Sequence, residues 1–135
     1  MKRTFLFAKL HQAKVTQADL HYEGSFSIDE ELLEVSGIHE NEQIHVLNIS
    51  NGHRFITYAI KAPKYSRIMG ANGACAHLVS PGDRVIICAY AELDSKEIEY
   101  FEPKVLFLDE NNNYRLKSQK SSNHKLSIQE NIITE

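Results

Sequence analysis

An Asn-Gly pair near the middle of this chain lies between two segments predicted as strands, the first of which alternates apolar and polar residues. The first segment is 44–49, the second is 54–60, and Asn51-Gly52 lies between them. Alternation with a period of two is typical of a strand with one buried face. Asn-Gly favours a tight hairpin turn, because both of its central positions need positive φ. The sequence therefore predicts an antiparallel hairpin here, with Asn51 and Gly52 as its turn.

Further strand signals lie on both sides of this hairpin. They predict strands at 4–8, 13–18 and 84–90, a turn at Pro81-Gly82-Asp83, and a last strand at 104–108. After Arg84 the segment 84–90 is continuously apolar, so we expect it to be buried on both faces.

Helix signals are few and short. Residues 27–30 resemble a capping box, with Asp29 as an alternative N-cap, and 30–36 follows as a short helix. Gly37 suits its C-terminal end. One or two further helical turns are predicted at 72–78. The pattern predicts a mainly β protein, a small closed barrel with a few short helices.

Composition limits the class of protein. The chain has 135 residues, 42% of them hydrophobic and 24% charged, which is typical of one globular domain. A net charge of -3 argues against nucleic-acid binding. The longest apolar run, 85–91, is too short to span a membrane, and Lys9 interrupts the apolar start too early for a signal peptide. We therefore expect a cytoplasmic protein with reduced thiols at Cys75 and Cys88.

The domain is expected to cover 1–116. The remaining residues, 117–135, are polar and lack a core pattern, which predicts a mobile tail with a frayed helix near 128–133.

Metal and nucleotide motifs are missing from the sequence. Its seven histidines form no HExxH motif, its two cysteines no CxxC motif, and its six glycines no GxGxxG motif. We therefore predict no metal site. The Gly24-Ser25 pair has two interpretations. It can be an ordinary turn, which the two residues alone favour, or a bond that rearranges when the serine hydroxyl attacks the exposed glycine carbonyl.

The surroundings of that pair favour the second interpretation. Four blocks occur in order: Lys9-Leu10-His11, 15–25, 51–60 and 72–77. Together they resemble the pyruvoyl-dependent aspartate 1-decarboxylases of bacterial pantothenate synthesis, and the resemblance runs from about residue 1 to 114. It implies a double-psi β-barrel and a homotetramer with active sites between subunits.

The resemblance also implies autocatalytic cleavage between Gly24 and Ser25. An ester replaces the amide, elimination leaves dehydroalanine, and hydrolysis releases ammonia. The products are a β chain, 1–24, and an α chain, 25–135, that begins with a pyruvoyl group derived from Ser25. The amine of L-aspartate forms a Schiff base with that ketone, and decarboxylation yields β-alanine. Neither a metal nor pyridoxal phosphate is implied.

The matched positions imply roles for individual residues. Tyr58 resembles the proton donor, Thr57 the residue that holds the Gly24 carbonyl during cleavage and later contacts the substrate, and Arg54 the residue that binds a substrate carboxylate. The other implied substrate-binding residues are Lys9, Gly73, Ala74 and Cys75. The implied supporting residues are His11, Tyr22, Glu23 and Asn72.

Two residues depart from the family pattern. Phe26 stands where a small residue or cysteine is common and could crowd the scissile turn, and Cys75 stands where alanine is common. Cys75 should matter little if its position acts through the backbone. Two alternatives stay open: a pyruvoyl decarboxylase of another small acidic amino acid, and an unprocessed barrel that serves as a binding module. A helper protein for maturation is a further possible partner.

Overall fold

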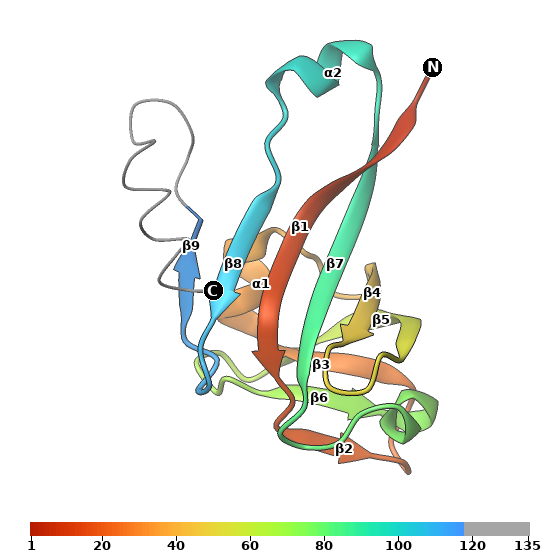
Figure 1. Ribbon diagram of the computed structural model, residues 1–135, viewed down its shortest axis with the longest axis vertical. Helices are drawn as coiled ribbons and strands as arrows, with labels where there is room; N and C mark the ends of the chain where they lie inside the picture. The colour runs from red at the N-terminus through yellow and green to blue at the C-terminus, as the bar shows by residue number, and fades with distance from the viewer. Residues whose placement is uncertain (118–135) are drawn as a thin grey trace.

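The computed structural model describes residues 1–117, which form a curled β-sheet with short helices (Figure 1). The strands are β1 Arg3–Lys14, β2 Gln17–Asp19, β3 Ser25–Asp29, β4 Gln43–Asn48, β5 Arg54–Ala62, β6 Met69–Asn72, β7 Arg84–Leu93, β8 Lys104–Leu108 and β9 Tyr114–Leu116. The helices are α1 Glu30–Ser36, the 3-10 turn η1 Gly73–His77, and α2 Ser95–Tyr100. The predicted tail and its frayed helix lie outside the described residues, apart from Lys117.

The strands form one hydrogen-bonded series in the order β2-β6-β3-β5-β4-β7-β1-β8-β9. Figure 1 shows β1, β7 and β8 running lengthwise, with β2, β3 and β6 crossing beneath them. Three pairs are parallel, namely β1 with β8, β2 with β6 and β3 with β5. This arrangement confirms the prediction of a mainly β fold of the small-barrel type, although within residues 1–117 the series ends at β2 and β9 instead of closing by backbone hydrogen bonds.

The first two predicted strands differ from the structure. The predicted strands 4–8 and 13–18 are replaced by one long strand, β1, and the separate short strand β2. β1 contains two irregularities in its register with β7, and at the second of them Gln12 has φ 65. A bulge of this kind lets one strand bend around the core while it keeps both neighbours.

The central hairpin is confirmed as the antiparallel pair β4 and β5. Its turn differs from the prediction, because only Gly52, with φ 83, has left-handed backbone. The connection is also wider than two residues. Asn48 N donates to His53 O at 2.8 Å, and Gly52 N donates to Asn48 O at 2.8 Å.

Four elements were not predicted, namely β3, β6, α2 and β9. Ser25 therefore begins a strand instead of lying in a loop, and β8 is not the last strand. The strand predicted at 84–90 extends to Leu93, and Tyr90 is 40% exposed, so burial on both faces is limited to its middle.

Helix α1 spans Glu30–Ser36 as predicted, and its N-cap is Asp29, the predicted alternative, and not Ser27. The Asp29 carboxylate accepts from Glu31 N at 2.8 Å, and Gly37 caps the other end as predicted. The same carboxylate accepts from Tyr65 N at 2.9 Å and from Arg67 N at 2.6 Å. Asp29 thus ties the loop between β5 and β6 to the start of α1, and this fixes where β6 enters the sheet.

A single hydrophobic core fills the inside of the curled sheet. Its largest fully buried side chains come from six strands and from α1, and they include Leu10, Phe26, Ile28, Leu32, Ile44, Met69, Ile87 and Leu106. Phe26 is 0% exposed, so its side chain points into the core and away from the solvent around the Gly24-Ser25 bond.

Candidate active site

One cavity collects six of the residues that the sequence predicted for the active site. It measures about 400 Å³ and is formed by β5, by the end of β6, by η1 and by Gly24. Its predicted members are Gly24, Thr57, Tyr58, Asn72, Ala74 and Cys75, and its apolar wall consists of Phe55, Ile56 and Leu78. Side chains far apart in the sequence meet here because β3 lies between β5 and β6 in the sheet.

The Ser25 hydroxyl is fixed by two hydrogen bonds. Ser25 is 1% exposed and lies opposite Asn72 in the β3–β6 register. Its Oγ donates to Glu23 O at 3.3 Å and accepts from Asn72 Nδ2 at 3.0 Å. The hydroxyl is therefore held beside the peptide bond that joins Ser25 to Gly24, which is the position that an attack on the Gly24 carbonyl requires.

Gly73 packs directly against the segment that ends at Gly24. Its φ is +70, and a Cβ at this position would lie 2.7 Å from Gly24 Cα, 2.9 Å from Gly24 N and 3.0 Å from Tyr22 O. Only glycine combines this backbone conformation with so close an approach. Gly73 therefore determines how near the Gly24 segment lies to η1.

Cys75 contacts the reacting segment through its side chain. Its Sγ donates to Asn72 O at 3.2 Å or to Ser25 O at 3.4 Å, and the residue is 8% exposed. Burial raises the pKa of the Cys75 thiol, and hydrogen bonds with the Asn72 and Ser25 backbone only partly offset the rise. The thiol is thus a neutral donor at pH 7, and the Cys75 side chain contacts the backbone of β3 and of Asn72.

Strand β5 presents its two faces to different surroundings. Arg54, Ile56 and Tyr58 are exposed, whereas Thr57 is half-buried, as the period of two predicts. Tyr58 is 39% exposed and Ile56 is 61% exposed, yet both border the cavity together with Thr57. The residues predicted for proton donation and for holding the Gly24 carbonyl therefore meet at one place.

The two predicted carboxylate-binding cations lie outside this cavity. Lys9 pairs with Cys88 in the β1–β7 register, and Arg54 lies on β5. Burial raises the pKa of the Cys88 thiol, while hydrogen bonding with Tyr90 and the charges of Lys9 and Arg54 partly offset the rise. Lys9 and Arg54 therefore share the surroundings of Cys88, on the outer face of the sheet.

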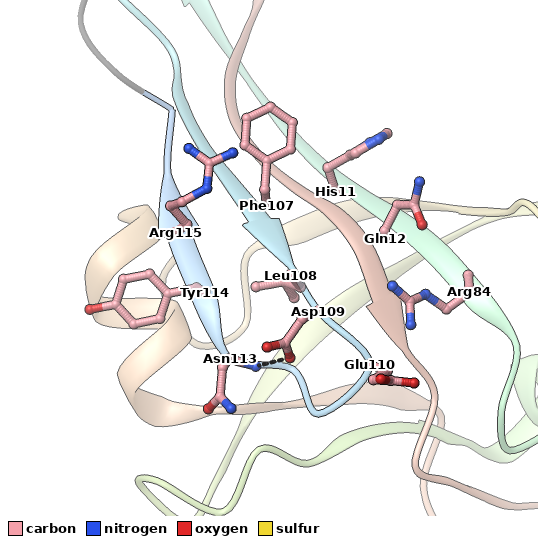
Figure 2. Close-up of a pocket in the computed structure, with 10 residues that line it drawn as sticks. All are labelled: His11, Gln12, Arg84, Phe107, Leu108, Asp109, Glu110, Asn113, Tyr114 and Arg115. Atoms are coloured by element: carbon pink, nitrogen blue, oxygen red, sulfur yellow. Dashed lines mark hydrogen bonds between the residues drawn. The ribbon is translucent and has the colours of Figure 1, made fainter. Parts of the chain in front are cut away.

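His11 lies in a different hollow. Figure 2 shows this pocket, which has a volume of about 520 Å³ and lies between the β1 bulge, β8 and β9. The His11 ring makes an edge contact with Phe107 at a centroid distance of 5.7 Å. Within one chain His11 is thus not at the Gly24 cavity. Tyr22 is 56% exposed, and its backbone carbonyl packs against Gly73.

Two further kinds of feature, a cluster of metal ligands and a membrane-spanning helix, are absent from residues 1–117. In this part of the chain, no three His, Cys, Asp or Glu side chains gather in a way that could hold a metal ion. Among the same residues, no helix has the length and apolar character that crossing a bilayer requires.

One contact at the site was not predicted. Ser27, considered only as a helix cap, accepts a hydrogen bond from Asn72 Nδ2 at 2.9 Å. The signal that could have found it is the alternation of β3, because residues 25 and 27 of one strand point to the same face.

Comparison with known proteins gives a consistent result. Residues 1–115 match the family model described as Aspartate decarboxylase. The aspartate 1-decarboxylase of Maricaulis maris is 56% identical over 119 residues, which are 88% of this chain and 98% of the relative. Those of Halorhodospira halophila and Caulobacter vibrioides are 55% and 54% identical over 112 residues, which are 83% of this chain and 89% and 95% of the relatives.

Proposed function

This chain belongs to the aspartate decarboxylase family, and on that premise we propose that it is a carboxy-lyase that converts L-aspartate to β-alanine and carbon dioxide. The family match supports both the enzyme class and the substrate. We further propose that the β-alanine serves pantothenate and coenzyme A synthesis, and that the enzyme acts in the cytoplasm.

The proposal includes self-cleavage between Gly24 and Ser25. The observation that carries it is the buried Ser25 hydroxyl, held between Asn72 and the Glu23 carbonyl beside a glycine that lines a cavity. Attack forms a bond from Ser25 Oγ to the Gly24 carbonyl carbon and breaks the bond from that carbon to Ser25 N. The hydroxyl proton passes to the released amine. Thr57, in the same cavity, donates to the developing oxyanion on Gly24.

The residues around Ser25 fit the pyruvoyl group that the family implies. Position 25 stays anchored by the pairing of β3 with β6. Its neighbour Gly24 and its partner Asn72 both line the cavity of about 400 Å³, which is roomy enough for a small amino acid. A pyruvoyl ketone at residue 25 supplies an electron sink for the carbanion left when the α-carboxylate departs. Ala74 and Cys75 of η1 also line this hollow, so substrate would bind between β5 and η1.

Tyr58 is the proposed proton donor to the substrate Cα. It borders the cavity, and a phenol keeps its proton at neutral pH and can donate it. Arg54 and Lys9 are the proposed carboxylate ligands, because a guanidinium and a carboxylate pair through two parallel hydrogen bonds. His11, Tyr22 and Asn72 remain proposed supporting residues.

The positions of Arg54 and Lys9 support an assembly whose active sites lie between subunits. Neither cation lines the cavity of its own chain, whereas the outer sheet face that carries them exposes apolar Ile56, Tyr58 and Tyr90. Packing a second copy on this face would bury those side chains and add charge to the cavity mouth. We propose the family's homotetramer, and light scattering of the purified protein measures its mass in solution.

Intact mass of the denatured protein is the first test of the proposed function. Two fragments divided at Gly24/Ser25, the larger lacking the serine amine, are expected together with release of carbon dioxide from aspartate. Ser25→Ala should give one folded, inactive chain. A wild-type chain that stays whole after warm incubation would instead support a non-catalytic barrel. A cleaved chain that prefers another acidic amino acid would overturn only the choice of substrate.

A further inference from the structure

Asn72 stands at the start of η1 but does not cap it. Asparagine is among the preferred N-cap residues, because its side-chain oxygen can accept from a free backbone N–H of the first turn. Here the Asn72 side chain makes no such bond to η1. Both bonds from its amide nitrogen go to β3 instead, at 3.0 Å to Ser25 Oγ and at 2.9 Å to Ser27 Oγ.

The register of the sheet explains this geometry. Asn72 lies directly opposite Ser25, and Ser27 lies two residues further along β3 on the same face. A side chain on one strand reaches both its opposite and its diagonal neighbour. The Asn72 amide nitrogen carries two N–H groups, and the hydroxyls of Ser25 and Ser27 are their two acceptors. Only one orientation of the amide satisfies both hydrogen bonds.

From this arrangement we infer that Ser27 is a positioning residue for self-cleavage, acting through Asn72. The inference rests on the proposed function, because it concerns the same cleavage step. Asn72 is 5% exposed, so an amide N–H that lost its acceptor would be buried without a partner. The hydroxyl of Ser27 therefore keeps the amide turned toward Ser25, and the amide keeps the Ser25 hydroxyl beside the Gly24 carbonyl carbon that it attacks.

The chemistry confines this role to maturation. In the attack, Ser25 Oγ bonds to the Gly24 carbonyl carbon, the bond from that carbon to Ser25 N breaks, and the hydroxyl proton passes to the nitrogen. The later elimination removes the Ser25 Cα proton, forms a double bond between Cα and Cβ, and breaks the bond between Cβ and Oγ. The oxygen leaves as part of the Gly24 carboxylate. After maturation Ser25 Oγ is gone, so the chain of contacts from Ser27 to Asn72 to Ser25 exists only in the precursor.

The test follows the precursor from its synthesis. The full chain is translated in a cell-free system, translation is stopped, and the uncleaved fraction is measured by denaturing mass analysis over time. Ser27→Ala should slow cleavage about two- to tenfold, as expected for the loss of one neutral hydrogen bond. Ser27→Thr keeps the hydroxyl and should cleave at nearly the wild-type rate.

Two comparisons separate positioning from general destabilisation. Ser36→Ala removes another buried serine hydroxyl, which donates to Leu33 O at 3.1 Å and accepts from Ile38 N at 3.3 Å, far along the chain from the cleavage site. It should lower the melting temperature without slowing cleavage. In an Asn72→Ala background, Ser27→Ala should have no further effect.

Equal cleavage rates for wild type and Ser27→Ala would overturn this inference and leave the proposed function intact. The inference also fails, again without harm to the proposed function, if Ser36→Ala slows cleavage as much as Ser27→Ala does, or if Ser27→Thr is as slow as Ser27→Ala. If the wild-type chain itself never divides, the proposed function fails and this inference fails with it.

Discussion

Replacing Gly73 with alanine tests the closest approach at the site. The new Cβ would lie 2.7 Å from Gly24 Cα, and the residue would keep φ +70. An L-residue in left-handed backbone costs about 1–2 kcal/mol, and forcing a methyl group into a packed site costs about 1–3 kcal/mol. The two effects together predict a loss of about 2–5 kcal/mol. The obstructing atoms belong to Gly24 and Tyr22. Relief of the clash must therefore shift the Gly24 backbone relative to the Ser25 hydroxyl.

Gly82→Ala is the matched control. Gly82 has φ +97, but a Cβ there would meet nothing within 4 Å, so this variant carries the backbone strain alone. Stability is measured by urea unfolding of both variants in a Ser25→Ala background, where every chain remains uncleaved. Cleavage is measured by denaturing mass analysis with Ser25 present. Gly73→Ala should lose more stability than Gly82→Ala and cleave at least about tenfold more slowly. Wild-type cleavage in Gly73→Ala, with no stability loss beyond the control, would refute this reasoning.

Three further outcomes follow from the site and the loop anchored by Asp29. Tyr58→Phe should still be cleaved but lose about 100-fold or more in kcat, whereas Tyr65→Phe, which changes an exposed tyrosine, should turn over normally. A normal kcat in Tyr58→Phe would exclude Tyr58 as the proton donor. Arg54→Ala should raise KM for aspartate about tenfold or more, with partial recovery in Arg54→Lys, and an unchanged KM would remove Arg54 from the site. Burial alone would raise the pKa of Asp29, but N–H donors from Arg67, Glu31 and Tyr65 and the Arg67 guanidinium lower it overall. The ionised Asp29 carboxylate therefore stabilises the fold above about pH 4, and this stabilisation is lost as the pH falls further. Asp29→Asn should be about 2 kcal/mol less stable than the wild type at pH 7. In urea unfolding, the difference in the free energy of unfolding between the two should be smaller near pH 3.

Elements with strong local signals were predictable from the sequence. The hairpin of β4 and β5 follows from the alternation in 44–49 and from the Asn51-Gly52 pair, and α1 follows from a capping residue at Asp29 and from Gly37. The predicted helical turn after Asn72 is confirmed as η1. In each case a few residues that are neighbours in the sequence determine the local backbone conformation. Tertiary contacts are therefore hardly needed to predict these elements.

Other elements depend on contacts between distant segments. β1 stays continuous through Gln12 at φ 65 because β7 and β8 hold it on both sides, which a window of sequence does not reveal. β6, Met69–Asn72, contains glycine, alanine and asparagine, which are weak strand formers. It is a strand because β2 and β3 pair with its two edges.

The same distinction applies to the candidate site. Linear blocks indicated Gly24, Ser25, Thr57, Tyr58 and 72–75, and the fold gathers these residues around one cavity. The blocks could not show that Lys9, Arg54 and His11 lie outside this cavity in the same chain. The order of blocks along a sequence does not determine the distances between their residues in the fold. Ser27 escaped notice because its contact depends on the β3–β6 register.

The sheet order determines what cleavage does to the fold. The segment 1–24 contributes β1, which lies between β7 and β8, and β2, which pairs with β6. Ala8 and Leu10 of β1 are 0% exposed, so withdrawing this segment would open the core. The Gly24-Ser25 bond lies where the exposed connection after β2 meets the first residue of β3, at the very end of the β3–β6 ladder. The proposed cleavage would therefore free a new chain end at residue 25, while backbone pairing on both sides of β1 would hold the two products together. The products are expected to separate only when the sheet is denatured.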